Sequence, residues 1–256
     1  MGRGKVFLVG AGPGDHRLLT MKAVDFLKKA DIVIYDRLVT KSILKLIPKR
    51  AKKVYVGKRS GRHELTQEKI NELMINTALD GKRVVRLKGG DPFLFGRGGE
   101  EAEALADSDI DFEVVPGITS ALATPAYAGI PLTHRDYSSS VAIVTGHQAE
   151  RAERVVNWSK LANSVDTIVI LMGVEQLESI VNNLIEGGLD SNTPVAIIEW
   201  GTIKRQRCLI GKLGTIAKEA KEKNVKPPAV IVVGEVVKLG EKLSWFKMHL
   251  RSKEEP

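Results

Sequence analysis

The sequence predicts an α/β protein made of two αβ domains, the first with a mainly parallel sheet and the second with a mixed sheet. Short β-branched runs alternate with amphipathic helical segments, and glycine-rich or charged loops follow several of the runs. A break at Pro116-Gly117 divides the chain into domains of residues 1–116 and 117–256. Strands that alternate with helices favour parallel pairing. A cleft between the two domains is the default ligand site.

The first half alternates regularly between strand and helix. Five strands are expected, over Lys5–Val9, Ile32–Tyr35, Val54–Gly57, Arg83–Leu87 and Phe112–Val115. Helices are expected between them, over Leu19–Ala30, from the cap Thr66 to Ala78, and over Glu100–Ala106. Each strand is followed by a helix or a loop that leads to one, so the charged loops gather at one edge of the sheet.

The second half alternates more loosely. A helix begins after Thr119 or Ser120, either of which can cap it. Strands are expected over Val141–Thr145, Thr167–Met172, Val195–Trp200, Arg207–Leu213 and Val230–Val237, and helices over Val174–Ile185 and Ile216–Glu222. The last three strands have only one helix between them, which predicts a mixed sheet. The tail, Lys253–Pro256, is typical of a disordered end.

The most informative stretch runs from Lys88 to Glu101, KGGDPFLFGRGGEE, directly after a predicted strand. Glycine costs backbone entropy and buries no side chain, so we interpret the stretch as a loop where a ligand approaches bare backbone. Asp91 offers acceptor oxygens to a ribose diol or an amine. The alternative is a tight strand-to-helix turn in which Asp91 is only a local cap. Glu100 and Glu101 fall at a helix start, where the dipole favours negative charge.

Other loops at predicted strand ends carry further candidates. Val9 leads into GAGPGD, which differs from a dinucleotide fingerprint because Pro13 stiffens the loop before any helix begins. This loop is either a wall for a ligand or a structural turn. Asp36 is either a general base or a helix cap, and Arg37 either an anion contact or a surface charge. Lys58 follows the third strand.

Composition narrows the classes of protein. The net charge of +8, with a pI near 9.5, suggests an anionic partner or a solvated basic face. Nucleic acid is not expected, because the few aromatic residues are not interleaved with the basic ones. No secretory signal or membrane span is predicted. Cys208, the single cysteine, excludes an internal disulfide and favours a cytoplasmic protein, with Cys208 itself a small buried residue.

The chain resembles the tetrapyrrole (corrin and porphyrin) methyltransferases from about Lys5 to Val237. The motifs that carry the resemblance are VGAGPGD from Val9, YDRLV from Tyr35, GKR from Gly57, the 89–101 loop, VPGITSA from Val115 and AGIPLTHR from Ala128. The glycine-proline loop alone would fit several methylases of the superfamily, including diphthine synthase. The 89–101 loop together with residues 129–135 is more specific.

The resemblance implies methyl transfer from S-adenosyl-L-methionine to carbons 2 and 7 of uroporphyrinogen III, giving precorrin-2 and S-adenosyl-L-homocysteine. It also implies a homodimer, with the cofactor between the two domains. Methyl transfer from a sulfonium requires no metal, and the sequence offers no clustered metal ligands. Asp36 would be the proton acceptor and Lys58 the proton donor. Four residues would face the tetrapyrrole polycarboxylate: Arg37, Arg97, Glu100 and Arg135. The cofactor would touch Pro13, Gly89, Gly90, Asp91, Leu94, Thr119, Ser120, Met172 and Gly201.

Two alternatives stay open at this point. The first is a methylase of the same architecture that acts on a later corrin intermediate or on the diphthine precursor, the modified histidine of elongation factor 2. Met172 is also ambiguous from its position, because a methionine after an apolar strand usually fills a core.

Overall fold

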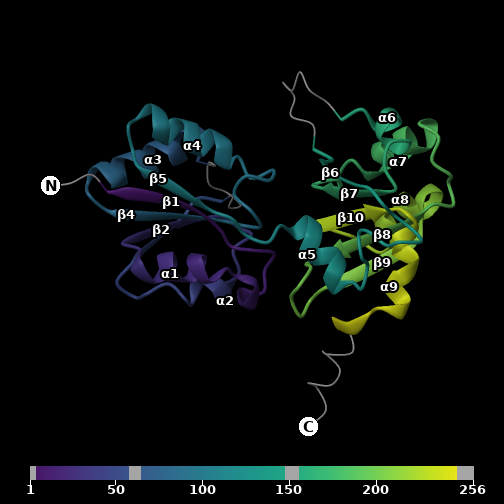
Figure 1. Cartoon of the computed structure of the whole chain (residues 1–256), viewed down its shortest axis with the longest axis horizontal. Coiled ribbons are helices and arrows are strands. Elements are labelled where there is room, and N and C mark those ends of the chain that lie inside the picture. The colour runs from purple at the N-terminus through teal and green to yellow at the C-terminus, as the bar shows by residue number, and fades with distance from the viewer. Residues whose placement is uncertain (1–3, 58–64, 148–155, 247–256) are drawn as a thin grey trace, which may run out of the picture. The chain divides into compact units, whose positions relative to one another are not determined.

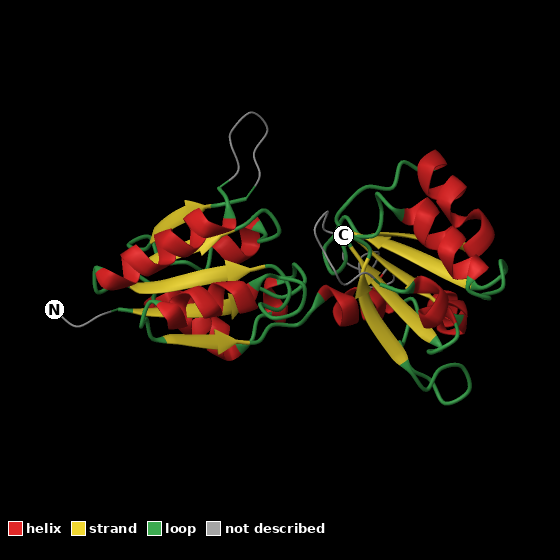
Figure 2. Ribbon diagram, turned by 90° about the horizontal axis from the view of Figure 1, so that it is seen from above, coloured by secondary structure: helices red, strands yellow, loops and turns green. Residues whose placement is uncertain are grey.

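The computed structural model describes residues 4–57, 65–147 and 156–246. The chain divides into two compact units, unit 1 over Met1–Thr119 and unit 2 over Ser120–Pro256 (Figure 1). Each unit contains its own sheet with helices packed on it, and Figure 2 shows helices lying over the strands of each sheet. The expected pair of αβ domains is therefore confirmed.

The sheet of unit 1 is parallel throughout. Its strands are β1 (Lys5–Gly10), β2 (Ile32–Tyr35), β3 (Lys52–Tyr55), β4 (Arg83–Lys88) and β5 (Phe112–Val115). Their spatial order is β3-β2-β4-β1-β5, which places β4 and β1 inside the sheet. All strands therefore end at the same edge, which we call the carboxyl edge of unit 1.

Helices cover both faces of this sheet. They are the 3-10 turn η1 (His16–Leu18), α1 (Met21–Lys29), α2 (Lys41–Leu44), α3 (Gln67–Leu79) and α4 (Gly98–Asp107). Strand residues alternate between faces, so Phe7 packs with α1 and α2 while its neighbour Leu8 packs with α3 and α4. Thr66 caps α3 as predicted, accepting the Lys69 N–H at 3.4 Å.

The sheet of unit 2 is mixed, as predicted. Its strands are β6 (Val141–Thr145), β7 (Thr167–Leu171), β8 (Pro194–Glu199), β9 (Arg207–Lys212) and β10 (Ala229–Val233). The order is β6-β7-β10-β8-β9, with β6 and β7 parallel and every other pair antiparallel. Since β7 and β8 both run opposite to β10, they point the same way and end at one edge.

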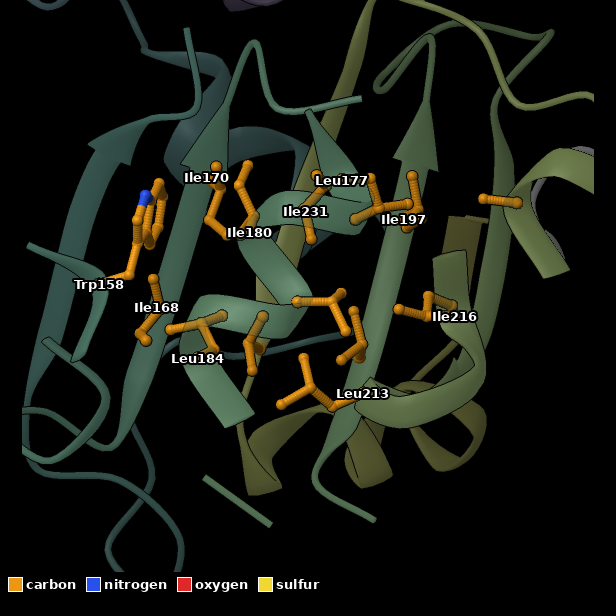
Figure 3. Packing of buried hydrophobic residues seen from close by; sticks show 14 of the residues in the cluster. Trp158, Ile168, Ile170, Leu177, Ile180, Leu184, Ile197, Leu213, Ile216 and Ile231 are labelled. Atoms are coloured by element: carbon orange, nitrogen blue, oxygen red, sulfur yellow. The ribbon is translucent and has the colours of Figure 1, made fainter. Parts of the chain in front are cut away.

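The main core of unit 2 lies under three helices on one face, α6 (Trp158–Ala162), α7 (Leu177–Glu186) and α8 (Leu213–Glu222). Figure 3 shows Trp158, Ile180 and Ile216 meeting isoleucines of the strands there. The other face is covered by α5 (Ser120–Tyr127) and the C-terminal η2 (Glu235–Lys238); α9 (Leu239–Lys242) follows directly.

Several boundaries differ from the predicted ones. The last strand ends at Val233 rather than Val237, because Gly234 adopts φ +140° and a 3-10 turn follows. The short helices α2, α6 and α9 were not predicted. Cys208 is half-buried rather than fully buried. The predicted disordered tail lies outside the described residues.

Candidate active site

The loops after β1, β4 and β5 meet at the carboxyl edge of unit 1. Gly12 and Gly90 form an antiparallel bridge, with N···O distances of 3.1 and 2.8 Å. Both glycines have positive φ, +71° and +69°, a conformation that other residues rarely adopt. A Cβ on Gly117, after β5, would lie 2.4 Å from the Gly90 carbonyl oxygen. Three chain segments therefore touch through bare backbone, beside Pro13 and Gly89.

Asp91 connects two of these segments. Its Oδ1 accepts the Phe93 N–H at 2.8 Å, and its Oδ2 accepts the Gly117 N–H at 3.0 Å. Asp91 therefore closes a local turn and ties the loop to Gly117, but it does not cap α4, which begins only at Gly98. A carboxylate oxygen has two lone pairs, so each oxygen also keeps acceptor capacity for a ligand donor.

Much of the glycine content of the 88–101 loop serves packing. A Cβ on Gly89 would lie 2.7 Å from Cβ of Leu38, and one on Gly98 would lie 2.2 Å from the Pro92 carbonyl oxygen. Close packing therefore requires glycine at Gly89 and Gly98, and approach of a ligand to this backbone stays a prediction. Leu94 lies half-buried within the same loop.

Asp36 stands at the carboxyl end of β2. Its Oδ1 accepts the Leu38 N–H at 3.0 Å, which is a local turn rather than a helix cap, and its side chain is 27% exposed. Its Oδ2 faces Nη2 of Arg86 at 3.8 Å. Arg37 follows it and is exposed. The partly open carboxylate has the position that the sequence predicted.

A buried ionic cluster of Arg86, Lys88 and Glu101 lies beneath the 88–101 loop. Oε1 of Glu101 accepts from Arg86 Nε and from Lys88 Nζ, both at 2.9 Å, and Glu101 has no exposed surface. Burial, followed by the charge of Arg86, lowers the pKa of Lys88, although Glu101 and Asp36 oppose this. Sequence analysis missed the cluster. Its signal was Arg86 between the apolar residues of β4, with Lys88 at the end of the same strand, in a sheet whose faces are both covered.

Arg97 and Glu100 lie at the exposed rim of the same loop. They form a two-pronged ion pair, with Nε–Oε1 at 3.0 Å and Nη2–Oε2 at 2.6 Å. Hydrogen bonding from Arg97 lowers the pKa of Glu100. Arg97 adopts φ +58° at the start of α4, an uncommon conformation that aims its side chain at the rim.

Three of the predicted cofactor residues belong to unit 2. Ser120 begins α5, Met172 follows β7 and Gly201 follows β8. A Cβ on Gly201 would lie 2.4 Å from Oγ1 of Thr124, so this turn packs directly on α5. Met172 has φ +55° and is 52% exposed. It does not fill a core.

The remaining predicted residues are less informative by geometry. Thr119 closes unit 1 and is half-buried, and Arg135 lies exposed in the turn between His134 and Ser138 of unit 2. Lys58 lies outside the described residues. We find no cluster of metal-ligating side chains in the described ranges, and no helix there is both long and apolar enough to cross a bilayer.

The residues at the carboxyl edge suit S-adenosyl-L-methionine. The molecule presents a ribose diol, an ammonium group and a sulfonium, which require acceptor oxygens and close backbone. Asp91 retains acceptor capacity, and the backbone of Gly90 stands half-exposed beside it. Open α/β sheets bind ligands at this edge.

The chain has a parallel sheet with a glycine-lined carboxyl edge, joined to a mixed αβ unit. This combination indicates a methylase, and comparison with known proteins agrees. The chain belongs to the Tetrapyrrole (Corrin/Porphyrin) Methylases, whose family pattern matches residues 5–217.

Particular relatives are more specific. The chain is 47% identical over 251 residues to the uroporphyrinogen-III C-methyltransferase of Bacillus subtilis, covering 98% of each chain. It is 52% identical over 247 residues to a siroheme synthase of an Enterobacter species, covering 96% of this chain and 53% of that protein. A crystal structure of uroporphyrin-III C-methyl transferase from Thermus thermophilus, complexed with S-adenyl homocysteine, is similar with a TM-score of 0.80 and 42% identity. It covers 92% of this chain and 100% of that one.

Proposed function

We propose that the chain is an S-adenosyl-L-methionine-dependent C-methyltransferase that methylates uroporphyrinogen III at C2 and C7. The products are precorrin-2 and S-adenosyl-L-homocysteine. The observation that carries the proposal is the near-complete match, 98% of both chains at 47% identity, to a relative named for this activity. The ligand in the Thermus structure supports the choice of cofactor.

The chemistry requires positioning more than activation by the protein. Bound S-adenosyl-L-methionine supplies a methyl group on an already activated sulfonium. The protein must hold the attacking carbon in line with it, which accounts for several orders of magnitude in rate. In this proposal the cofactor is held by the Asp91 carboxylate and by the backbone of Gly89 and Gly90. The other residues that hold it are Pro13, Leu94, Thr119, Ser120, Met172 and Gly201.

The tetrapyrrole is a polycarboxylate, so its binding favours arginine forks. Arg37, Arg97 and Arg135 serve this purpose, and Glu100 orients Arg97 through their ion pair. Methylation leaves positive charge on the ring system and a proton to be lost. Asp36 stabilises that charge or accepts the proton, and Lys58 acts as the proton donor.

We further propose a homodimer in the cytoplasm. The resemblance to the family suggests the dimer, and a single cysteine is in keeping with a reducing compartment. Sedimentation velocity of the purified protein checks the dimer: one species at twice the mass of the chain supports it, and a monomer at all concentrations contradicts it.

Two assays test the function. Calorimetric titration with S-adenosyl-L-homocysteine should show binding. Anaerobic incubation with uroporphyrinogen III should yield the dimethylated product, whereas a later corrin intermediate and unmodified elongation factor 2 should not be methylated. Turnover of either of those substrates in place of uroporphyrinogen III would contradict the proposed substrate.

A further inference from the structure

Arg86 is a charge in a place that normally excludes charges. It lies on β4, which has strands on both sides and helices on both faces, and it is 4% exposed. Burial of an ion costs free energy that a partner only partly restores, so a buried ion pair is a weak source of stability. A role in stability alone therefore explains the residue poorly.

The structure fixes the direction of the Arg86 guanidinium. Its Nε donates to Glu101 at 2.9 Å, and its Nη1 faces the carbonyl oxygens of Leu87 at 3.3 Å and Ile34 at 3.5 Å. The remaining nitrogen, Nη2, faces Oδ2 of Asp36 at 3.8 Å. Because the guanidinium is planar and rigid, partners on two of its nitrogens set where the third points.

Asp36 is correspondingly held on two sides. The Leu38 N–H fixes Oδ1, while the cation of Arg86 lies opposite Oδ2. At 3.8 Å this is a charge contact rather than a direct hydrogen bond. It orients a carboxylate whose side chain is still 27% exposed to solvent.

Lys88 connects the Glu101 carboxylate, which also binds Arg86, to the 88–101 loop. Its Nζ shares Oε1 of Glu101 with Arg86, and its Cε lies 3.4 Å from where a Cβ of Gly96 would stand. Glu101 itself belongs to α4, which begins directly after Arg97. The buried Glu101 carboxylate thus links Arg86, which faces Asp36, to the loop that carries Arg97.

We propose that Arg86 is a positioning residue that holds the Asp36 carboxylate at the reacting tetrapyrrole, and that Glu101 and Lys88 hold Arg86 in that orientation. The inference rests on the proposed function, because it takes Asp36 as the carboxylate that faces the reacting ring. Arg86 acts through Asp36 and does not touch the substrate.

The test is a double-mutant cycle of Arg86→Lys and Asp36→Asn, assayed anaerobically with uroporphyrinogen III. Arg86→Lys keeps a cation beside Glu101 but removes the fork that points at Asp36. It should lower kcat about tenfold in the presence of Asp36 and by less than about twofold in the Asp36→Asn protein. KM and the affinity for S-adenosyl-L-homocysteine should stay near the native values. Arg83→Lys, at the opposite end of the same strand, is the matched control and should leave kcat unchanged.

Equal losses in both backgrounds, no loss in either, or a parallel fall in S-adenosyl-L-homocysteine affinity would overturn the positioning role. If Asp36→Asn makes no measurable product, crystal structures decide instead. The Asp36 carboxylate should then be displaced in Arg86→Lys and not in Arg83→Lys, and an unmoved carboxylate would refute the proposal. Assay of the native protein distinguishes failure of the positioning role of Arg86 from failure of the proposed function. If the native protein is inactive on uroporphyrinogen III, the proposed function itself is refuted.

Discussion

Arg97 shows how one residue of this site is prepared for an anion. Its fork is already held by Glu100 at the rim of the 88–101 loop, and its left-handed backbone directs it there. A substrate carboxylate can add to or replace this pairing, because the guanidinium has five N–H donors. The cofactor, in our proposal, binds beside Asp91 and does not need this group.

Replacing Arg97 by alanine should therefore weaken tetrapyrrole binding more than cofactor binding. Loss of a charged hydrogen bond predicts a rise in the tetrapyrrole KM of about tenfold or more. The affinity for S-adenosyl-L-homocysteine, measured by calorimetry, should change by less than about twofold. Equal losses for both ligands would show that Arg97 supports the fold of the loop instead.

Gly117 tests the close backbone contacts at the carboxyl edge. Its alanine variant would place a Cβ 2.4 Å from the Gly90 carbonyl oxygen, and overpacking of this kind costs about 1–3 kcal/mol. Both the Tm and the affinity for S-adenosyl-L-homocysteine should fall. Gly99→Ala is the matched control, because nothing lies within 4 Å of its added Cβ. It should leave both quantities unchanged or raise the Tm slightly, and a similar loss in the two variants would contradict this account.

At the scale of elements, an ion pair joins the starts of β2 and β4. Asp31 accepts from Arg83 Nη2 at 3.0 Å and from the Arg83 N–H at 2.9 Å. These hydrogen bonds, first that from the side chain and then that from the backbone, lower the pKa of Asp31. The stabilisation is therefore present above the ordinary aspartate pKa of about 3.9 and is lost as pH falls through the lowered native value.

Asp31→Asn should consequently lower the Tm by about 1–2 °C at neutral pH, a small effect because solvent screens the pair. The difference from the native protein should shrink as the pH falls through the lowered native pKa of Asp31. Thermal unfolding of both proteins across this range measures it. In an Arg83→Met background the neutral-pH difference should shrink, and a gap that stays constant with pH would contradict the assignment.

The sequence predicted most of the elements but not the elements that depend on tertiary contacts. The long periodic helix α3, with its Thr66 cap, and the apolar strand β2 were predicted closely because local patterning determines them. The short helix α2 and the end of β10 at Gly234 were not, since neither has a repeating pattern long enough to detect.

The same limit applies to the site. Strand patterning placed Asp36 and the glycine-rich loops at strand ends, where the structure has them, while their roles stay predictions. Glu101 was expected only as a favourable charge at a helix start, whereas it is fully buried between Arg86 and Lys88. Adjacent glutamates in the sequence give no sign that one faces solvent and the other faces the core. That difference arises from the packing of α4 on the sheet.

At the scale of the whole molecule, the net charge of +8 suits a substrate fringed with carboxylates. Electrostatic attraction between them weakens as salt shortens the Debye length to about 3 Å at 1 M. Between about 50 mM and about 500 mM salt, kcat/KM for uroporphyrinogen III should fall roughly three- to tenfold with kcat nearly constant. Steady-state kinetics in KCl measures this, and a fall confined to kcat would count against attraction as the cause.

The central claim is that this chain transfers methyl groups to uroporphyrinogen III. The most direct measurement is mass spectrometry of the macrocycle after anaerobic incubation with S-adenosyl-L-methionine labelled in its methyl group. The account predicts two labelled methyl groups on each product macrocycle, with S-adenosyl-L-homocysteine formed in matching amount. An unlabelled macrocycle, recovered from a protein that binds S-adenosyl-L-homocysteine, would contradict it.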